Sequence, residues 1–205
     1  MIVGTFENDK LNKKGKIITD KFEYEGEILD NKPHGQGTRV LDGSEYTGKW
    51  RNGYEDGKGR LSMKNGDFYE GNFKRGQFSG YGIYTKKNGE KYEGNFVKGK
   101  KEGKGIIYFP ISKGSDFSSY EGDWQDDVPN GTGTVIYENG SIYVGEVVDG
   151  EIKGKGRMEI KEMKVEAGIS KVYEGDFVNR LFDGKKYCFY SLRVRKAVHK
   201  WRGGI

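Results

Sequence analysis

The sequence predicts an all-β protein: an elongated single antiparallel sheet of tandem β-hairpins, followed by a short C-terminal helix. Three observations predict this fold. Glycine supplies 34 of the 205 residues, aromatic residues supply 14 %, and the two recur together at a fixed spacing. Because there are only 3 prolines, the glycine belongs neither to a collagen-like chain nor to a proline–glycine linker. We therefore expect a thin core of rings lying against glycine.

A unit of about 23 residues repeats along almost the whole chain. Each copy begins with Tyr-x-Gly-x-(aromatic or apolar), and 11 residues after the tyrosine a Gly-x-Gly begins. The starting tyrosines are Tyr24, Tyr46, Tyr69, Tyr92, Tyr120, Tyr143 and Tyr173. The copy from Tyr173 lacks the second glycine, and a degenerate first copy begins at Ile2. About eight copies are therefore predicted, giving a repeat region at 2–184 and a separate basic segment at 185–205.

Each copy is expected to form two antiparallel strands. Asn-Gly or Asp-Gly between apolar-rich runs favours a type I′ turn, which needs positive φ at both central residues. Turns of this kind are predicted between copies at Asp42-Gly43, Asn65-Gly66, Asn88-Gly89 and Asn139-Gly140. Two inserts, 109–119 and 159–172, lengthen the remaining connections. Alternation along the strands places the repeat tyrosine and both Gly-x-Gly glycines on one face, with glycine making room for rings, and charged residues on the other.

The combination of Tyr-Glu-Gly and Gly-x-Gly at this period resembles the MORN repeat family (membrane occupation and recognition nexus). The motif is complete at Tyr24, Tyr69, Tyr92, Tyr120 and Tyr173. Threonine follows Tyr46 and valine follows Tyr143. The resemblance covers roughly residues 2–184 and implies a twisted antiparallel sheet that serves as a scaffold or partner-binding arm, in several relatives within cytoskeletal and ciliary assemblies. The kinase, methyltransferase or exchange-factor domains of some relatives have no counterpart in the remaining residues, so their activities are not implied.

The composition argues against an enzyme and against a metal or cofactor site. Cys188 is the single cysteine, and His34 and His199 are the only histidines, which is too few for a thiolate cluster or a histidine-based triad. The recurring Gly-x-Gly lacks the strand-to-helix setting that a phosphate loop requires. No run of 18 apolar residues and no signal-peptide pattern occurs. We expect a non-catalytic, cytoplasmic protein without a cofactor or a nucleic-acid partner.

Five apolar residues interrupt the charged face in the third to fifth copies. They are Tyr81, Ile83, Ile106, Tyr108 and Ile136. Alternate strands lie about 9–10 Å apart, so the five are predicted to form one patch. Exposed apolar patches mark interfaces, which favours a partner-binding surface. The alternative is that the insert at 109–119 folds back and covers the patch.

The C-terminal segment differs from the rest of the chain in charge. It carries seven cations and no acid: Lys185, Lys186, Arg193, Arg195, Lys196, Lys200 and Arg202. Val194, Ala197, Val198 and Trp201 follow helical spacing, which predicts a short amphipathic helix. One interpretation is a cap on the last strand edge. The other is contact with an acidic partner or a membrane through the cations and Trp201.

Two functions from different classes follow. The favoured one is a scaffold that binds other proteins, as a subunit of a larger intracellular assembly of cytoskeletal or ciliary type. The alternative is a peripheral binder of anionic phospholipid surfaces that acts through residues 185–205. Salt-sensitive binding to anionic vesicles would favour the second function, whereas a protein partner retained without that segment would favour the first.

Overall fold

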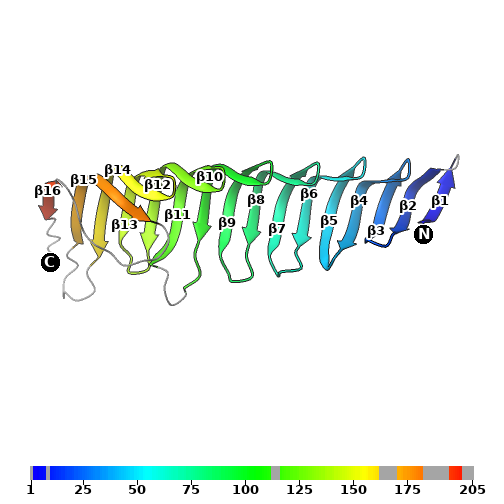
Figure 1. Ribbon diagram of the computed structural model, residues 1–205, viewed down its shortest axis with the longest axis horizontal. Coiled ribbons are helices and arrows are strands. Elements are labelled where there is room, and N and C mark those ends of the chain that lie inside the picture. Colours follow the sequence, from blue (N-terminus) through cyan, green and yellow to red (C-terminus); the bar gives the residue numbers. More distant parts are fainter. Residues whose placement is uncertain (1, 8–9, 112–115, 162–169, 182–193, 200–205) are drawn as a thin grey trace, which may run out of the picture. The chain divides into compact units, whose positions relative to one another are not determined.

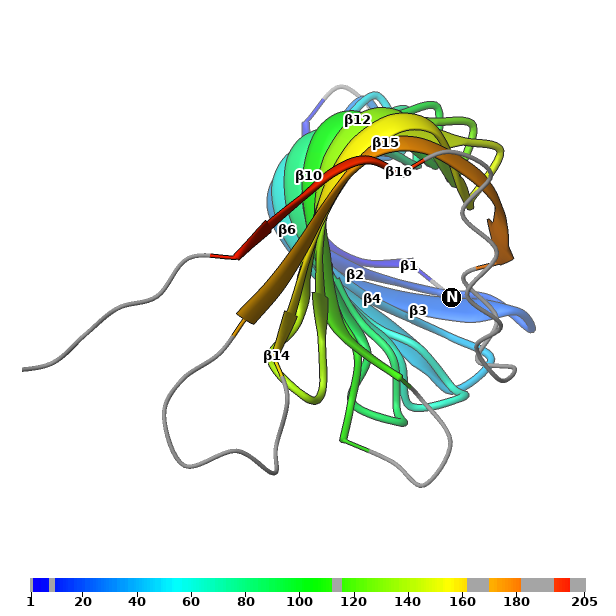
Figure 2. The ribbon, with the colours of Figure 1, turned by 90° about the vertical axis from the view of Figure 1, so that its left-hand side faces the viewer.

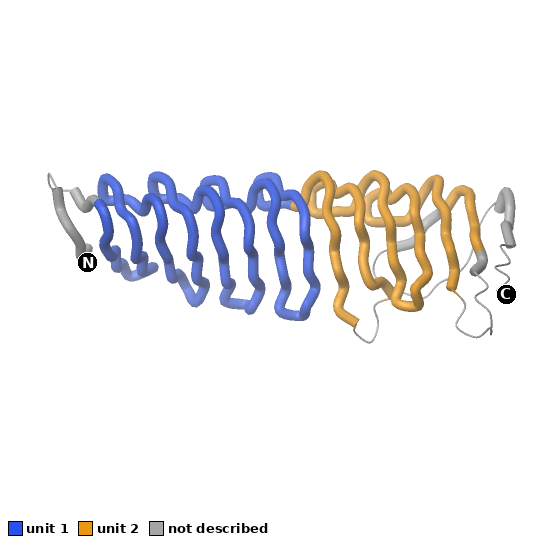
Figure 3. The backbone as a smooth tube through the Cα atoms, turned by 180° about the vertical axis from the view of Figure 1, so that it is seen from behind, with its two compact units in different colours: residues 1–100 blue, residues 101–205 orange. Residues whose placement is uncertain are grey.

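A computed structural model shows an all-β chain whose strands follow one another in sequence order (Figure 1). The structure describes residues 2–7, 10–111, 116–161, 170–181 and 194–199, and no helix occurs among them. The chain divides into two compact units, Met1–Lys100 and Lys101–Ile205 (Figure 3). Each unit is an antiparallel sheet of hairpins, so the predicted all-β class is confirmed.

Among the described residues, the first unit holds nine strands and the second holds seven. In the first unit they are β1 (Ile2–Glu7), β2 (Lys10–Ile18), β3 (Phe22–Leu29), β4 (Lys32–Leu41), β5 (Ser44–Arg51), β6 (Tyr54–Ser62), β7 (Phe68–Lys74), β8 (Gln77–Thr85) and β9 (Lys91–Val97). In the second they are β10 (Lys100–Tyr108), β11 (Phe117–Gln125), β12 (Val128–Tyr137), β13 (Ile142–Val148), β14 (Glu151–Lys161), β15 (Ser170–Leu181) and β16 (Val194–His199). Within each unit, every strand pairs with the next one in antiparallel orientation.

A line of paired glycines crosses the strands of each unit. In the first unit it runs through Gly15, Gly26, Gly37, Gly48, Gly59, Gly71, Gly82 and Gly94. In the second it runs through Gly105, Gly122, Gly133, Gly145, Gly156 and Gly175. A Cβ atom on Gly82 would lie 2.4 Å from the Tyr69 hydroxyl oxygen. The repeat tyrosine therefore lies across these glycines, as predicted for the second glycine of Gly-x-Gly.

The six repeat tyrosines from Tyr24 to Tyr143 are buried and hydrogen-bonded in the same way. The Tyr69 side chain has no exposed surface, and its hydroxyl donates a 2.9 Å hydrogen bond to the carbonyl of Asn72. The same bond to the third residue along the chain is made by Tyr24, Tyr46, Tyr92, Tyr120 and Tyr143. A buried hydroxyl without a partner would cost about 1–3 kcal/mol, so this bond makes tyrosine suitable for a core position.

Aromatic rings connect neighbouring copies. Tyr46 packs edge-on against Trp50 of its own copy, with ring centroids 5.1 Å apart, and against Phe73 of the next copy at 4.8 Å. Tyr69 repeats the arrangement with Phe73 at 5.1 Å and Phe96 at 5.3 Å. Edge-to-face pairs contribute about 0.5–1.5 kcal/mol beyond the burial of their area. The core is thus a row of rings that no single copy could bury alone.

The first glycine of Gly-x-Gly does not lie under a ring, contrary to the prediction. A Cβ atom on Gly80 would have no neighbour closer than 3.7 Å, and one on Gly103 none within 4 Å. Both residues have positive φ, 63° and 71°. The strands pair at Gly71–Gly82 and again at Phe73–Phe78. Between these two pairs β7 has one residue, Asn72, whereas β8 has three, 79–81. Gly80 therefore supplies the left-handed backbone of a bulge, and bulges bend strands (Figure 2).

The predicted type I′ turns are confirmed at one position and wrong at the other three. Asp42 and Gly43 both have positive φ, 46° and 77°. In the three Asn-Gly pairs only the glycine does, and asparagine acts through its side chain: Asn65 Oδ1 accepts a 2.9 Å hydrogen bond from the Asp67 amide. Pairs of positive φ occur instead in the turns inside copies, as at 52–53 and 149–150. The sequence predicted a connection between the two strands of each copy but not the positive φ of its residues.

The predicted C-terminal helix is wrong where the structure describes it. Val194–His199 form β16, which pairs with β15. The open edge of β15 presents backbone groups that a strand can satisfy, and Val194 and Val198 suit a strand as well as a helix. The other residues of the expected helix, 191–193 and 200–203, lie outside the described residues.

Burial also changes the acidity of the repeat tyrosines. Loss of solvent raises the pKa of Tyr24 and Tyr69 to about 12. It raises the pKa of Tyr46, Tyr120 and Tyr143 as well. An unfolded tyrosine releases its proton near pH 10. Between about pH 10 and 12 the unfolded chain therefore binds fewer protons than the folded one.

Stability should stay level up to about pH 10 and fall as the pH rises further, because ionisation of tyrosine then favours the unfolded chain. Urea unfolding midpoints between pH 8 and 12 measure this. Tyr69→Phe should make the fall shallower. Tyr54→Phe, which changes an exposed ring, should leave its slope unchanged. A wild-type midpoint that does not fall above pH 10 would contradict the assignment.

Gly82→Ala should destabilise the protein by more than about 2 kcal/mol, because the new methyl group would overlap the Tyr69 ring. Gly103→Asn should cost about 1 kcal/mol or less, since asparagine tolerates positive φ and the space is open. Urea unfolding measures both changes. Glu70→Ala on the solvent face is the control, with an expected loss below about 0.5 kcal/mol. Similar losses for Gly82→Ala and Glu70→Ala would show that the faces are assigned wrongly.

Candidate partner-binding surface

Side chains that do not enter the ring core lie on the opposite side of each sheet, here called the outer face. On β7 and β8, Glu70 lies opposite Ile83 on the outer face, whereas Tyr69 and Tyr84 pair on the ring face. This agrees with the alternation expected from the sequence. The outer face is therefore the surface on which partner-binding residues are to be sought.

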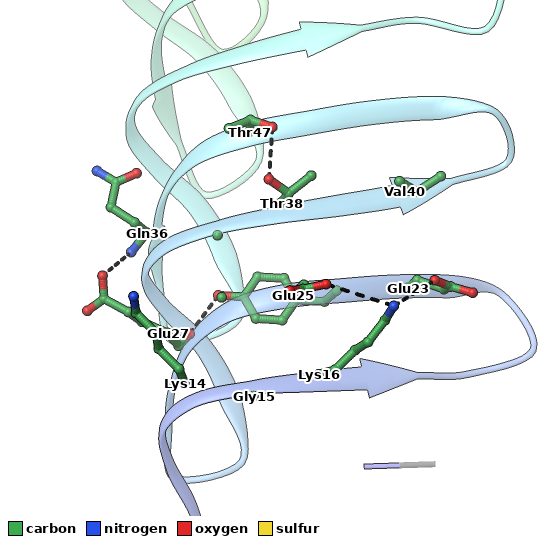
Figure 4. Close-up of a pocket in the computed structure, with 13 residues that line it drawn as sticks. Lys14, Gly15, Lys16, Glu23, Glu25, Glu27, Gln36, Thr38, Val40 and Thr47 are labelled. Carbon is green, nitrogen blue, oxygen red and sulfur yellow. Dashed lines mark hydrogen bonds and ion pairs between the residues drawn. The ribbon is translucent and has the colours of Figure 1, made fainter. Parts of the chain in front are cut away.

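The outer face of the first unit is mostly polar, as the hollow between β2 and β5 shows (Figure 4). The Lys16 ammonium lies 3.5 Å from a Glu23 carboxylate oxygen and 3.8 Å from one of Glu25. The hydroxyls of Thr38 and Thr47 are 3.0 Å apart. Exposed pairs of this kind contribute at most about 1 kcal/mol each. The groups satisfy one another, so we interpret the hollow as solvated surface.

Some outer carboxylates have a structural role at the bulges. Glu27 Oε1 accepts a 2.9 Å hydrogen bond from the Gln36 amide, and Asp123 Oδ2 accepts one of 3.0 Å from the Thr132 amide. Lys104, 2.7 Å from Asp123, and this amide lower the pKa of the Asp123 carboxyl. These acids hold the bent strands in place, which accounts for them without a catalytic role.

Tyr81 and Ile83 lie on the outer face of the first unit, as predicted. The Tyr81 ring is exposed, and its hydroxyl donates a hydrogen bond to Glu93 Oε1. This hydrogen bond and the one from Lys91 lower the pKa of the Glu93 carboxyl. Ile83 is half-buried between Glu70 and Glu93 on the adjacent strands. In this unit the two apolar side chains are thus flanked by carboxylates.

The second unit gathers more apolar side chains on its outer face. Tyr108, Ser119, Ile136 and Ile142 occupy paired positions on β10, β11, β12 and β13. Val144 lies two residues after Ile142, on the same face of β13. We call Tyr108, Ile136, Ile142 and Val144 the outer apolar surface; their exposed fractions are 42, 39, 38 and 49 %. Ile136 and Ile142 are directly opposed on neighbouring strands, which lie about 4.8 Å apart, whereas Tyr108 is separated from Ile136 by Ser119 of β11.

The predicted patch is divided between the two units. Tyr81 and Ile83 belong to the first unit, whereas Ile106, Tyr108 and Ile136 belong to the second. Ile106 is half-buried and lies opposite Glu121.

Ile142 and Val144 were missed, although the sequence carried the signal. Val144 replaces the glutamate of the Tyr-Glu-Gly motif. Ile142 and Val144 flank Tyr143, so alternation places both opposite its ring. An apolar residue in place of the motif glutamate, on the solvent side of the strand, therefore indicates the outer apolar surface.

The described part of the insert at 109–119 packs toward the ring face. The Phe109 and Phe117 ring centroids lie 6.3 Å apart, and Phe117 lies 5.2 Å from Tyr137, which is buried on the ring face. Ile111 is 93 % exposed. Residues 112–115 lie outside the described part, and among the described residues Tyr108 is left exposed.

Few of the predicted basic residues fall within the described residues. Arg195 and Lys196 lie in β16, and Lys196 is opposite Glu174 of β15. The other five basic residues and Trp201 lie outside the described residues: Lys185, Lys186, Arg193, Lys200, Trp201 and Arg202.

No metal site and no membrane-spanning helix is seen in the part of the chain that the structure describes. Its histidine, cysteine, aspartate and glutamate residues form no group of three or more that could hold a metal ion. The described residues contain no helix long and apolar enough to cross a membrane. Cys188 lies outside that part. His34 lies within it, and its backbone carbonyl accepts a 3.4 Å hydrogen bond from the Tyr24 hydroxyl.

Comparison with known families agrees with the repeat geometry. A family model described as MORN repeat matches residues 24–42, 46–68, 69–91, 92–112, 120–142 and 143–160. The matches cover more than half of the chain, and each begins at a repeat tyrosine. The chain belongs to the MORN repeat family. MORN repeats form a non-enzymatic module that is consistent with binding to proteins or membranes.

Proposed function

We propose that this MORN repeat protein is a non-catalytic scaffold that binds a protein partner on the outer apolar surface of its second unit. The observation that carries the proposal is the exposure of Ile136, Ile142 and Val144 on neighbouring positions of β12 and β13, with the exposed Tyr108 two strands away on β10. Two charged residues flank these side chains: Arg157 is paired with Val144, and Glu121 is paired with Ile106, two residues before Tyr108. An apolar centre with charges around it is the usual anatomy of a protein–protein interface. The partner is thus a protein that offers a complementary apolar face.

The surface is suited to binding with little loss of entropy. Ile136, Ile142 and Val144 are β-branched, so few rotamers remain to be frozen. Their strands are hydrogen-bonded on both sides, which holds the backbone in place. Tyr108 adds an aromatic ring, and tyrosine is frequent among residues that dominate binding energy.

The proposal extends to the setting of the protein. We place it in the cytoplasm, within a larger cytoskeletal or ciliary assembly. The single cysteine supports a reducing compartment, and the tandem repeats support a role in binding other subunits. The MORN family includes partner-binding arms of this kind.

A second candidate function is binding to anionic membrane surfaces. Seven lysines and arginines without an acid in residues 185–205 favour it, because polybasic segments are attracted to anionic lipids. Deleting the whole segment would also remove β16. We therefore test it with Lys185→Gln, Lys186→Gln, Lys200→Gln and Arg202→Gln together, which leaves that strand in place. Loss of salt-sensitive binding to phosphatidylserine vesicles by this variant would favour the membrane function.

The protein-binding function is tested with Ile136→Thr/Ile142→Thr, which makes a directly opposed pair polar and keeps its branched shape. Partners captured by the wild-type chain and identified by mass spectrometry should bind the variant at least tenfold more weakly. The melting temperature should change little, because both side chains face solvent. Val40→Thr is the matched control, since Val40 is an exposed valine between Glu23 and Glu45. Full binding by a stable double variant would exclude this surface.

A further inference from the structure

The turns inside copies lie side by side along one edge of each unit. In the first unit the amides of Gly53, Gly76 and Gly99 donate 2.9 Å hydrogen bonds to carbonyls of the preceding copy, at Pro33, Glu55 and Phe78. In the second unit the Gly150 amide does the same to Pro129. Each turn is thereby fixed to its neighbour. The charges on these turns consequently have set positions.

The turn edge of the first unit is basic. Four turn segments have their turn residues within the described part of this unit. Each is made of two turn residues and the strand residue on either side, and they span 29–32, 51–54, 74–77 and 97–100. They contain one acid, Asp30, and six exposed cations: Lys32, Arg51, Lys74, Arg75, Lys98 and Lys100. Asp56 forms an ion pair with Arg51 at 3.6 Å. Because it offsets only one of the six cations, the excess of positive charge remains large. Leu29, Tyr54 and Val97 are exposed on the same segments.

The turn edge of the second unit is acidic. Its turn segments in the described residues span 125–128 and 148–151. They contain no lysine or arginine and four acids: Asp126, Asp127, Asp149 and Glu151. Lys101 and Arg180 lie near this edge, Arg180 opposite Ile152 on β15. The Lys101 ammonium is placed over the Trp124 ring, 4.9 Å from the centroid. Val128 and Val148 are exposed between the acids.

The fold does not require this separation of charge. Arg75, Lys98, Asp126 and Asp149 all occupy the first residue of a turn, with φ of 49°, 51°, 49° and 51°. One backbone position thus accepts a cation in one unit and an acid in the other. Because both signs are compatible with the turn, the sorting of charge by unit is a property of the surface and not of folding.

We propose that the chain binds a second copy of itself, with the turn edge of the first unit of one copy against the turn edge of the second unit of the other. Opposite charges on the two edges would steer the encounter and select this pairing. Tyr54 and Val97 on one edge and Val128 and Val148 on the other supply apolar area to bury. An acidic protein or an anionic membrane would use the basic edge alone and would leave the acidic edge unexplained. This contact is separate from the outer apolar surface and does not rest on it.

The test is charge exchange at matched turn positions in the full chain. One variant is Arg75→Asp/Lys98→Asp, which makes both edges acidic, and the other is Asp126→Lys/Asp149→Lys, which makes both basic. Every substitution introduces a residue type that the chain already carries at that turn position. Sedimentation equilibrium at 50 mM salt should show self-association of the wild type, weakened at least tenfold in each variant. A mixture of the two variants should associate again.

The control for the change in net charge is a third variant, measured in the same sedimentation experiment. Lys21→Asp/Lys87→Asp changes the net charge equally but acts on the turns between copies, at the other ends of the strands, and should leave association unchanged. Raising the salt to 500 mM should weaken the wild-type complex, since exposed charges are screened. A wild-type chain that stays monomeric at 100 μM would overturn the proposal. So would variants that associate normally, or a mixture of the two that remains monomeric.

Discussion

The fold depends on the contact between one tyrosine ring and the glycines beneath it. A single sheet has no second layer to bury its apolar face against, so the ring must lie flat on the backbone itself. Only glycine permits this: a Cβ atom on Gly82 would meet the Tyr69 hydroxyl oxygen at 2.4 Å. Because Gly71 pairs with Gly82, the same contact sets the strand register. The spacing of 11 residues between paired glycines within a copy follows from that register, which explains why it varies so little along the chain.

This contact leaves the other side of the sheet free to vary. The ring face and the bulges determine the backbone, so an outer residue such as Val144 can replace a glutamate without disturbing Tyr143 beneath it. The ring face itself tolerates charged residues: Arg39 and Glu55 occupy positions that are apolar in most other copies. The two pair with each other at 2.5 Å, and Arg39 lies over the Trp50 ring. A repeat protein can therefore acquire a unique binding site by changing outer side chains in one copy while the repeated backbone stays the same.

The sequence predicted the features that local patterns specify. Strand alternation and the fixed spacing identified the repeat, the two faces and the exposure of Tyr81, Tyr108 and Ile136. It failed where residues outside the pattern decide the outcome. Gly80 follows the same alternation as Gly82, and only the two extra residues of the bulge separate their roles. Val194, Ala197 and Val198 fit a helix by spacing, but the neighbouring strand β15 determines that they form β16. The Asn-Gly pairs indicated turns correctly, although asparagine acts there through its side chain and not through positive φ.

The two surfaces inferred on the second unit lie on different parts of its strands. Tyr108, Ile136, Ile142 and Val144 face away from the rings, whereas Asp126 and Asp149 lie in turns at the strand ends. A protein bound on the face and a second copy bound at the edge would therefore use different groups. Association of two copies would also bring two outer apolar surfaces into one particle. Against a partner with two matching sites, the second binding step becomes intramolecular, which strengthens binding without any new contact. A scaffold whose single docking surface is small gains most from this arrangement, because each individual contact can remain weak.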